Sequence, residues 1–123
     1  MRVLLADNQS QARSALQILL KQEPDILVVG EASEAHTLLA QITTIKPDIV
    51  LLDWSLAESP TIATLATLRT ACPHLRVIAL SGRPEACNEA LAAGADAFIS
   101  KTDPPEQLLA TLRAVNGNRN RRL

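Results

Sequence analysis

Aromatic residues are nearly absent from this chain of 123 residues, which contains one Trp, one Phe and no Tyr. Apolar residues nevertheless make up 47% of the sequence, so the core must be built from Leu, Ile, Val and Ala. A chain of this length fits one domain, which buries roughly two-thirds of its unfolded surface. The sequence therefore predicts a single aliphatic core with closely packed elements.

The chain also lacks the features of secreted, membrane and nucleic-acid-binding proteins. Its two cysteines form no C-x-x-C motif, and no apolar run approaches the roughly eighteen residues that a membrane span needs. Twelve basic and thirteen acidic residues give a net charge of −1, which argues against a domain that mainly neutralises nucleic-acid phosphates. We expect a cytoplasmic protein with reduced thiols, and we interpret residues 117–123 as a basic tail or the start of a linker.

Five short apolar runs alternate with segments of helical periodicity. The runs predict strands at residues 2–6, 26–30, 48–52, 76–80 and 97–100, and the segments after them predict five helices. Prolines and Gly94 stand where these helices should begin or end. Because the strands are continuously apolar rather than alternating, we predict an α/β fold with a doubly wound parallel sheet, covered by helices on both faces.

Polar residues follow four of the five predicted strands. In an open parallel sheet, ligands bind beyond the carboxyl ends of the strands, so these residues should converge. They are Asp7 and Asn8, Asp53 and Ser55, Ser81, and Lys101. Two carboxylates suit a hard divalent cation such as Mg²⁺, and a carboxylate can also attack phosphorus while a hydroxyl and an ammonium stabilise the phosphoryl oxygens.

Four motifs in order carry a family resemblance: VLLADNQ, PDIVLLD, VIALSG and GADAFISK. Together they resemble the response-regulator receiver domain over residues 2–116, and the run VVGEA at 28–32 resembles its NarL/LuxR type. The resemblance implies a flavodoxin-like sheet of order 2-1-3-4-5, with residues 1–116 forming one receiver domain. It implies a two-component phosphoacceptor rather than an enzyme, with at most autophosphorylation from a donor and autodephosphorylation.

Carried over residue by residue, the resemblance assigns a role to each converging side chain. Asp53 becomes the phosphoacceptor. The implied Mg²⁺ ligands are Asp7, Asn8, Asp53 and the backbone carbonyl of Ser55. The residues implied to stabilise the phosphoryl group and to switch are Ser81, Lys101 and Phe98.

The resemblance also implies partners. A sensor histidine kinase would donate the phosphoryl group, and the face formed by the fourth helix, the fifth strand and the fifth helix could form a homodimer. Members of the NarL/LuxR type usually regulate transcription, so DNA would be contacted only through an output domain absent from this chain. No contact with a membrane is expected.

Three departures from the family pattern qualify these roles. Asn8 stands where the family has a second acidic residue, so we predict weakened Mg²⁺ binding and slower phosphoryl transfer, and also less repulsion in the metal-free site. The segment SLAESPT replaces the usual Met-Pro after the acceptor, which leaves the loop shape open and makes Glu58 a candidate to return the missing charge. The third departure is Thr102, which follows Lys101 where many receivers have a proline, so no cis Lys-Pro bond is expected there. Apart from these departures, Trp54 beside the acceptor is expected to be partly exposed.

Other interpretations stay open. Taken singly, Asp53 could be a turn residue or a helix cap, Lys101 a lysine lying along a strand end, and Phe98 a core residue. The chain as a whole could be a pseudo-receiver, an interaction module that acts without phosphorylation. A phosphatase with an aspartyl nucleophile would require a second Asp two positions later, and a nucleotide-binding fold a glycine-rich loop after the first strand; the sequence has neither.

Overall fold

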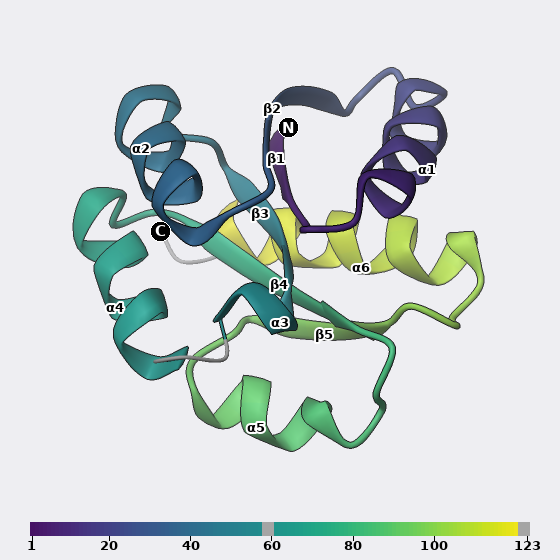
Figure 1. Ribbon diagram of the computed structural model, residues 1–123. Helices are drawn as coiled ribbons and strands as arrows, with labels where there is room; N and C mark the ends of the chain where they lie inside the picture. The colour runs from purple at the N-terminus through teal and green to yellow at the C-terminus, as the bar shows by residue number, and fades with distance from the viewer. Residues whose placement is uncertain (58–60, 121–123) are drawn as a thin grey trace.

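The computed structural model describes residues 1–57 and 61–120, with only the backbone described for residues 57, 61–64 and 118–120. Strands and helices alternate along the chain (Figure 1). The strands are β1 (Arg2–Ala6), β2 (Leu27–Ala32), β3 (Ile49–Asp53), β4 (Arg76–Ser81) and β5 (Ala97–Ser100). The helices are α1 (Ser10–Lys21), α2 (Ala35–Ile45), α3 (Trp54–Ala57), α4 (Thr61–Ala71), α5 (Ala86–Ala92) and α6 (Pro105–Asn120).

The five strands form one parallel sheet of order β2-β1-β3-β4-β5, which confirms the predicted fold and strand order. The order reverses between β1 and β3, so the carboxyl ends of these strands flank the crevice where such sheets bind ligands. All residues of β3 and β4 are buried, as expected for central strands covered on both faces.

Two hydrophobic clusters lie on opposite faces of the sheet. Within each central strand, alternate side chains enter different clusters; Val50 and Leu52 belong to one, whereas Ile49 and Leu51 belong to the other. The first cluster includes residues of α2, α4 and α5, and the second includes residues of α1 and α6 (Figure 1). The core is aliphatic as predicted, because leucine, isoleucine, valine and alanine dominate both clusters.

The helix count differs from the prediction of five. The described residues contain a sixth helix, α3, a single turn that begins directly after β3. A four-residue helix is too short to produce a hydrophobic period, so no periodicity could have indicated it. The segment SLAESPT after Asp53, whose shape the sequence left open, thus starts as a helical turn. Glu58, the candidate for returning the missing charge, lies outside the described residues.

Glycine and proline lie at helix ends where the sequence predicted them. Gly94 follows the end of α5 with φ of 109°, a left-handed conformation that favours glycine, and its N–H is bonded to Leu91 O at 3.1 Å. Pro105 begins α6, where its missing N–H leaves no helical bond unmade. No helix in the described part of the chain is long and apolar enough to cross a membrane.

Candidate functional site

Four of the predicted site residues converge at the carboxyl edge of the sheet. Asp53 and Ser81 are the last residues of β3 and β4, whereas Asp7 and Lys101 directly follow β1 and β5. Asp7, Asp53 and Ser81 are buried, with residue exposures of 1%, 6% and 5%. Polar groups buried to this degree need partners, and the partners of each one define the site.

Lys101 joins the two carboxylates. Its Nζ atom lies 2.8 Å from Oδ2 of Asp7 and 3.4 Å from Oδ2 of Asp53. The Lys101 side chain is 25% exposed, so the ammonium group compensates two more deeply buried carboxylates from the rim of the site. These three charges sum to −1, which leaves the site attractive to a further cation.

The Asp53 carboxylate also accepts hydrogen bonds from Ser55. The Ser55 hydroxyl donates to Oδ2 at 2.9 Å, and the Ser55 backbone N–H donates to Oδ1 at 3.3 Å. Asp53 therefore caps the first turn of α3, a use of aspartate that is common at helix starts. The family resemblance implied a role only for the Ser55 carbonyl. The Asp-x-Ser spacing is the sequence signal that could have revealed the hydroxyl contact.

Asp7 is held by the start of α1 as well as by Lys101. Its Oδ1 atom accepts a hydrogen bond from the backbone N–H of Gln9 at 2.9 Å, and its backbone carbonyl accepts one from Nη1 of Arg13 at 2.5 Å. Each carboxylate oxygen of Asp7 thus has a donor. The side chain is fixed in place before any ligand binds.

A hollow of about 380 Å³ lies over the Asp53 carboxylate. Its lining residues come from the loops after β1, β3, β4 and β5: Asn8, Gln9, Asp53, Ser55, Ser81, Gly82, Arg83 and Lys101. The Ser81 hydroxyl accepts a hydrogen bond from the Arg83 backbone N–H at 3.0 Å, which orients it at the rim. Gln9 and Arg83 were not singled out from the sequence: Gln9 ends the motif VLLADNQ without an implied role, and Arg83 directly follows the motif VIALSG.

Asp7, in contrast, lines a neighbouring cavity of about 290 Å³ between α1 and α6. Lys101 lines both spaces, so its ammonium group marks the boundary between them. Most of the remaining wall is apolar: α1 contributes two alanines and two leucines, α6 contributes Pro105 and Leu108, and β4 and β5 contribute Leu80 and Ile99.

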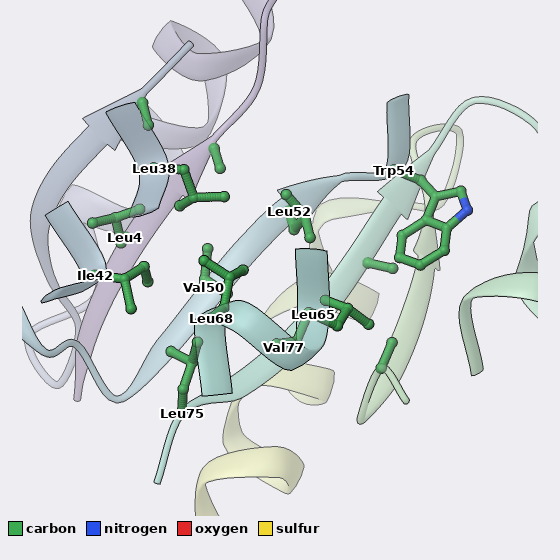
Figure 2. Packing of buried hydrophobic residues seen from close by; sticks show 14 of the residues in the cluster. Leu4, Leu38, Ile42, Val50, Leu52, Trp54, Leu65, Leu68, Leu75 and Val77 are labelled. Carbon is green, nitrogen blue, oxygen red and sulfur yellow. The ribbon is translucent and has the colours of Figure 1, made fainter. Parts of the chain in front are cut away.

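Phe98 and Trp54 lie outside the hollow. Phe98 is half-buried and packs against the cluster on the α2, α4 and α5 face. The expectation that Trp54 is partly exposed is wrong: the side chain is fully buried in that same cluster (Figure 2). The reason is the turn of α3, which directs residue 54 into the core and leaves the next residue, Ser55, exposed beside the acceptor.

The donor set around Lys101, with Asp53 in the hollow and Asp7 in the neighbouring cavity, fits Mg²⁺ in kind. This ion takes one or two carboxylates and completes its octahedron with waters and phosphate oxygens, and Asp7 and Asp53 supply two such carboxylates. The side-chain amide oxygen of the exposed Asn8, which lines the hollow, is a third candidate ligand and carries no charge. Among the described residues, no three His, Cys, Asp or Glu side chains group into an all-protein metal cage. A metal would therefore share these carboxylates with the Lys101 ammonium.

Comparison with known proteins decides the family. The family model described as the response regulator receiver domain matches residues 3–113. The chain belongs to this family. Receiver domains in general are phosphoacceptors of two-component systems that bind Mg²⁺ at the acidic site, and the predicted receiver identity is confirmed.

Individual relatives support the NarL/LuxR type. The nitrate/nitrite response regulator NarL of Escherichia coli is 33% identical over 112 residues, which cover 89% of this chain and 52% of NarL. The receiver domain of the putative response regulator NarL of Mycobacterium tuberculosis has a TM-score of 0.79 at 27% identity, covering 94% of this chain and 96% of that one. The response regulator domain of Thermotoga maritima CheB has a TM-score of 0.80 at 26% identity, covering 94% and 95%. The chain spans about half the length of the curated relatives it matches.

Proposed function

We propose that this receiver accepts a phosphoryl group on Asp53 from a sensor histidine kinase. One observation carries the proposal: the Asp53 carboxylate lines the 380 Å³ hollow together with Ser81 and Lys101. The Nζ atom of Lys101 lies 3.4 Å from Oδ2 of Asp53. A nucleophilic carboxylate, a cation and a hydroxyl around one open space are the groups that phosphoryl transfer requires.

In the proposed reaction, a carboxylate oxygen of Asp53 attacks the phosphorus of a phosphohistidine. The new O–P bond forms as the P–N bond breaks, and the electron pair leaves with the imidazole nitrogen, which then takes up a proton. Lys101 and Ser81 contact the phosphoryl oxygens, where charge is concentrated. Bound Mg²⁺, held by Asp7, Asp53, Asn8 and the Ser55 carbonyl, would supply further neutralisation of these oxygens.

Before transfer, the Asp53 carboxylate must lose some of its present contacts. The Ser55 hydroxyl contacts one carboxylate oxygen at 2.9 Å, and Lys101 contacts the same oxygen at 3.4 Å. The phosphoryl group adds roughly two negative charges, so Lys101 gains a stronger partner than the carboxylate alone. Ser81 and the half-buried Phe98 rearrange in response, and the face of α5, β5 and α6 changes partners or forms a homodimer.

Weak Mg²⁺ binding is part of the proposal. Asn8 contributes no charge, and Lys101 already lies between the two carboxylates that a metal would need. At 4 Å and an effective dielectric of 20, a pair of unit charges is worth about 4 kcal/mol and a carboxylate beside a divalent ion about twice that, and solvent returns much of this loss. Phosphoryl transfer is therefore slowed rather than abolished.

The molecular context is inferred from the relatives. Several curated relatives are transcriptional regulators about twice as long as this chain, so we infer that residues 1–116 form the receiver domain and that residues 117–123 lead into a linker. DNA would then be contacted by an output domain, and the cytoplasm is the compartment in which kinase and DNA are both accessible.

A pseudo-receiver is the second candidate, and the Lys101 contacts favour it. The ammonium group and the Ser55 donors satisfy Asp53 without metal, so a stable resting state exists with no phosphoryl chemistry. In that case the domain acts as an interaction module of fixed conformation.

Intact mass spectrometry after incubation with acetyl phosphate and Mg²⁺ separates the two candidates. We expect a gain of one phosphoryl group in the native chain, a faster gain in Asn8→Asp, and none in Asp53→Asn. A gain only in Asn8→Asp would mean that the native metal site is too weak for transfer. No gain in either protein would leave the pseudo-receiver as the function.

A further inference from the structure

The cavity of about 290 Å³ beside the hollow has no part in the proposed phosphoryl transfer. It lies on the face of the sheet that α1 and α6 cover (Figure 1). Its volume is close to the lower end of the range for ligand pockets, roughly 300–1,000 Å³, and corresponds to the liquid volume of about ten waters. Packed elements of one domain leave few spaces of this size between them, so we asked what the cavity could bind.

Small side chains on α1 leave room for the cavity. Ala12 and Ala15 both line it; Ala12 is half-buried and Ala15 is exposed, so the cavity reaches the surface along this helix. The sheet contributes the buried Leu80 and Ile99, and α6 contributes the buried Leu108. Water finds few hydrogen-bond partners along such a wall, so an apolar group that takes its place is favoured.

The charged residues of the lining are Asp7, Lys101 and Asp103. Two carboxylates and one ammonium group give this wall a net charge of −1, and the same ammonium group also compensates Asp53 at 3.4 Å. A cation in the cavity is therefore stabilised, whereas an anion would face two carboxylates whose counter-charge is already shared. The charge of the wall thus selects a positively charged ligand.

Both carboxylates of the wall are held in place and can accept further hydrogen bonds. Asp7 is 1% exposed; its Oδ1 accepts from the Gln9 backbone N–H at 2.9 Å and its Oδ2 from Lys101 Nζ at 2.8 Å. Asp103 is exposed, and its Oδ2 accepts from the Ser100 backbone N–H at 3.0 Å. A carboxylate oxygen can accept two hydrogen bonds, so an ammonium group can bind without displacing these donors. Two prolines follow Asp103 and restrict the backbone there, so this wall is preformed.

We propose that the cavity binds a small amphipathic amine. Its single ammonium group donates hydrogen bonds to the carboxylates of Asp7 and Asp103, and its compact apolar body packs against the alanine and leucine side chains of α1 and α6. The ligand lies beside Lys101, which also contacts Asp53, so the site borders the proposed phosphoacceptor. Binding of the amine does not rest on the proposed function, because it requires neither a metal nor a phosphoryl group.

Three probes with one apolar body test the proposal. 2-Phenylethylamine, 2-phenylethanol and phenylacetate carry a cationic, a neutral and an anionic head on the same benzyl group. Binding to the native chain in EDTA is followed by methyl NMR, with Ala12 and Ala15 as reporters and Ala79, in the cluster on the opposite face of the sheet, as the reference. We expect saturable shifts of both reporters with the amine, at a Kd of about 1 mM or tighter. Affinity should be at least about fivefold lower for the alcohol and about tenfold lower for phenylacetate.

Asp103→Asn tests the contact with the ammonium group. The substitution removes the charge but keeps a side-chain oxygen that can accept the Ser100 N–H, so the turn is retained. We expect it to weaken binding of the amine about two- to fivefold and to leave binding of the alcohol unchanged. Glu106→Gln is the matched control, because Glu106 is exposed in the first turn of α6, does not line the cavity and loses the same charge. It should change the affinity for the amine much less.

Ala12→Leu tests the apolar part of the cavity. The larger side chain occupies the space that the ligand body needs, so we expect the affinity for the amine and for the alcohol to fall at least about tenfold. Ala15→Leu, at an exposed position of the same lining, takes its place if the first variant does not fold. Ala110→Leu is the matched control, because Ala110 is exposed on α6 and does not line the cavity. This control should bind the amine as the native chain does.

Four results would overturn the proposal. The first is the absence of saturable shifts at Ala12 and Ala15 with the amine. The second is binding of the alcohol or of phenylacetate as tight as that of the amine, and the third is unchanged binding of the amine by a folded variant with leucine in the lining. The fourth is a shift of Ala12 and Ala15 that depends on protein concentration without any probe, since a second copy of the chain would then cover the cavity.

Discussion

At the scale of single residues, the polar site at the carboxyl edge of the sheet is organised around Lys101. Its ammonium group contacts Asp7 and Asp53 at 2.8 and 3.4 Å, where two buried carboxylates would otherwise repel each other. Because residue 8 is the neutral Asn8 rather than an acidic residue, no third carboxylate adds to this repulsion. The metal-free site therefore carries a net charge of only −1, and any added cation competes with the Lys101 ammonium for the two carboxylates.

The first prediction concerns Asn8→Asp. The added charge should tighten Mg²⁺ binding by about tenfold or more, because each 1.4 kcal/mol gives a factor of ten and the gross charge term is larger. Without metal, the same change should lower the free energy of unfolding by about 0.5–1 kcal/mol through carboxylate repulsion. Titration calorimetry with MgCl₂, and urea unfolding in EDTA, measure the two effects.

Gln9→Glu is the control for Asn8→Asp, since Gln9 lines the same hollow and gains the same charge. It should change Mg²⁺ affinity much less, because the position is not the one predicted to supply a ligand. Equal effects of the two substitutions would show that general charge, and not coordination by residue 8, governs metal binding.

Residue chemistry was predictable where motifs carried it. Asp7, Asp53, Ser81 and Lys101 were placed correctly at one edge because parallel strands bring their carboxyl ends together. The burial of Trp54 was not predictable, since it depends on a helical turn that no sequence period announces. Contacts between side chains of different loops, such as those of Lys101, follow from rotamers that the sequence pattern leaves undetermined.

At the scale of elements, β2 illustrates how packing modifies a predicted strand. The apolar run predicted residues 26–30, whereas β2 covers Leu27–Ala32. The register with β1 shifts between Val3 and Leu4, so that Leu4 pairs with Gly30. A Cβ atom at Gly30 would lie 2.6 Å from Oε1 of Gln41 and 3.1 Å from Cδ1 of Ile45, so the ends of two α2 side chains would have to shift to make room for it.

The second prediction follows from these contacts. Gly30→Ala should lower the free energy of unfolding by about 1–3 kcal/mol, the range expected for overpacking. Gly117→Ala in α6 is the matched control, because a Cβ atom there meets nothing within 4 Å. In that helix, alanine should instead stabilise by about 0.5–1 kcal/mol. Urea unfolding measures the free energy of unfolding of both variants. If Gly30→Ala leaves this free energy unchanged, the Gln41 side chain moves aside at no cost in stability, and the prediction is wrong.

The element missed from the sequence, α3, matters most for the site. Its first turn is capped by Asp53 and its first residue enters the core, so one short segment joins the Asp53 carboxylate to the hydrophobic cluster. Capping by an aspartate at a strand end was considered only as an alternative to function. In the structure the same carboxylate caps the helix and faces the hollow.

At the scale of the whole molecule, Arg113 connects distant parts of the chain. Its Nη2 atom on α6 lies 2.6 Å from Oε1 of Glu23 and 3.1 Å from Oδ1 of Asp25, in the turn between α1 and β2. The hydrogen bond from Arg113 lowers the pKa of Asp25 below its ordinary value of 3.8. The last helix is thereby tied to the first third of the chain on the face that α1 and α6 share.

The third prediction concerns Arg113→Gln and pH. Because the folded-state pKa of Asp25 is lowered, its contribution to stability is present above the ordinary value of 3.8 and is lost as pH falls through the lowered value. The variant should therefore be less stable than the native chain at neutral pH, and the difference should shrink below pH 3.8. Both groups are exposed, so high salt should also reduce the difference.

Urea midpoints measured across this pH range test the network. Lys21→Gln is the control, since it removes one positive charge from the last turn of α1 without removing the Asp25 contact. A difference between native chain and Arg113→Gln that does not vary with pH would show that lost packing of the arginine stem, and not the ionised pair, is responsible.

The central claim is that Asp53 is the residue that accepts the phosphoryl group. The measurement that tests it most directly is site mapping: incubate the native chain with acetyl phosphate and Mg²⁺, reduce the acyl phosphate with borohydride, and sequence the peptides by mass spectrometry. Reduction converts a phosphorylated aspartate to homoserine and so records its position. We predict homoserine at residue 53 alone. Homoserine at residue 7, or at no position despite a functioning phosphodonor, would contradict the account.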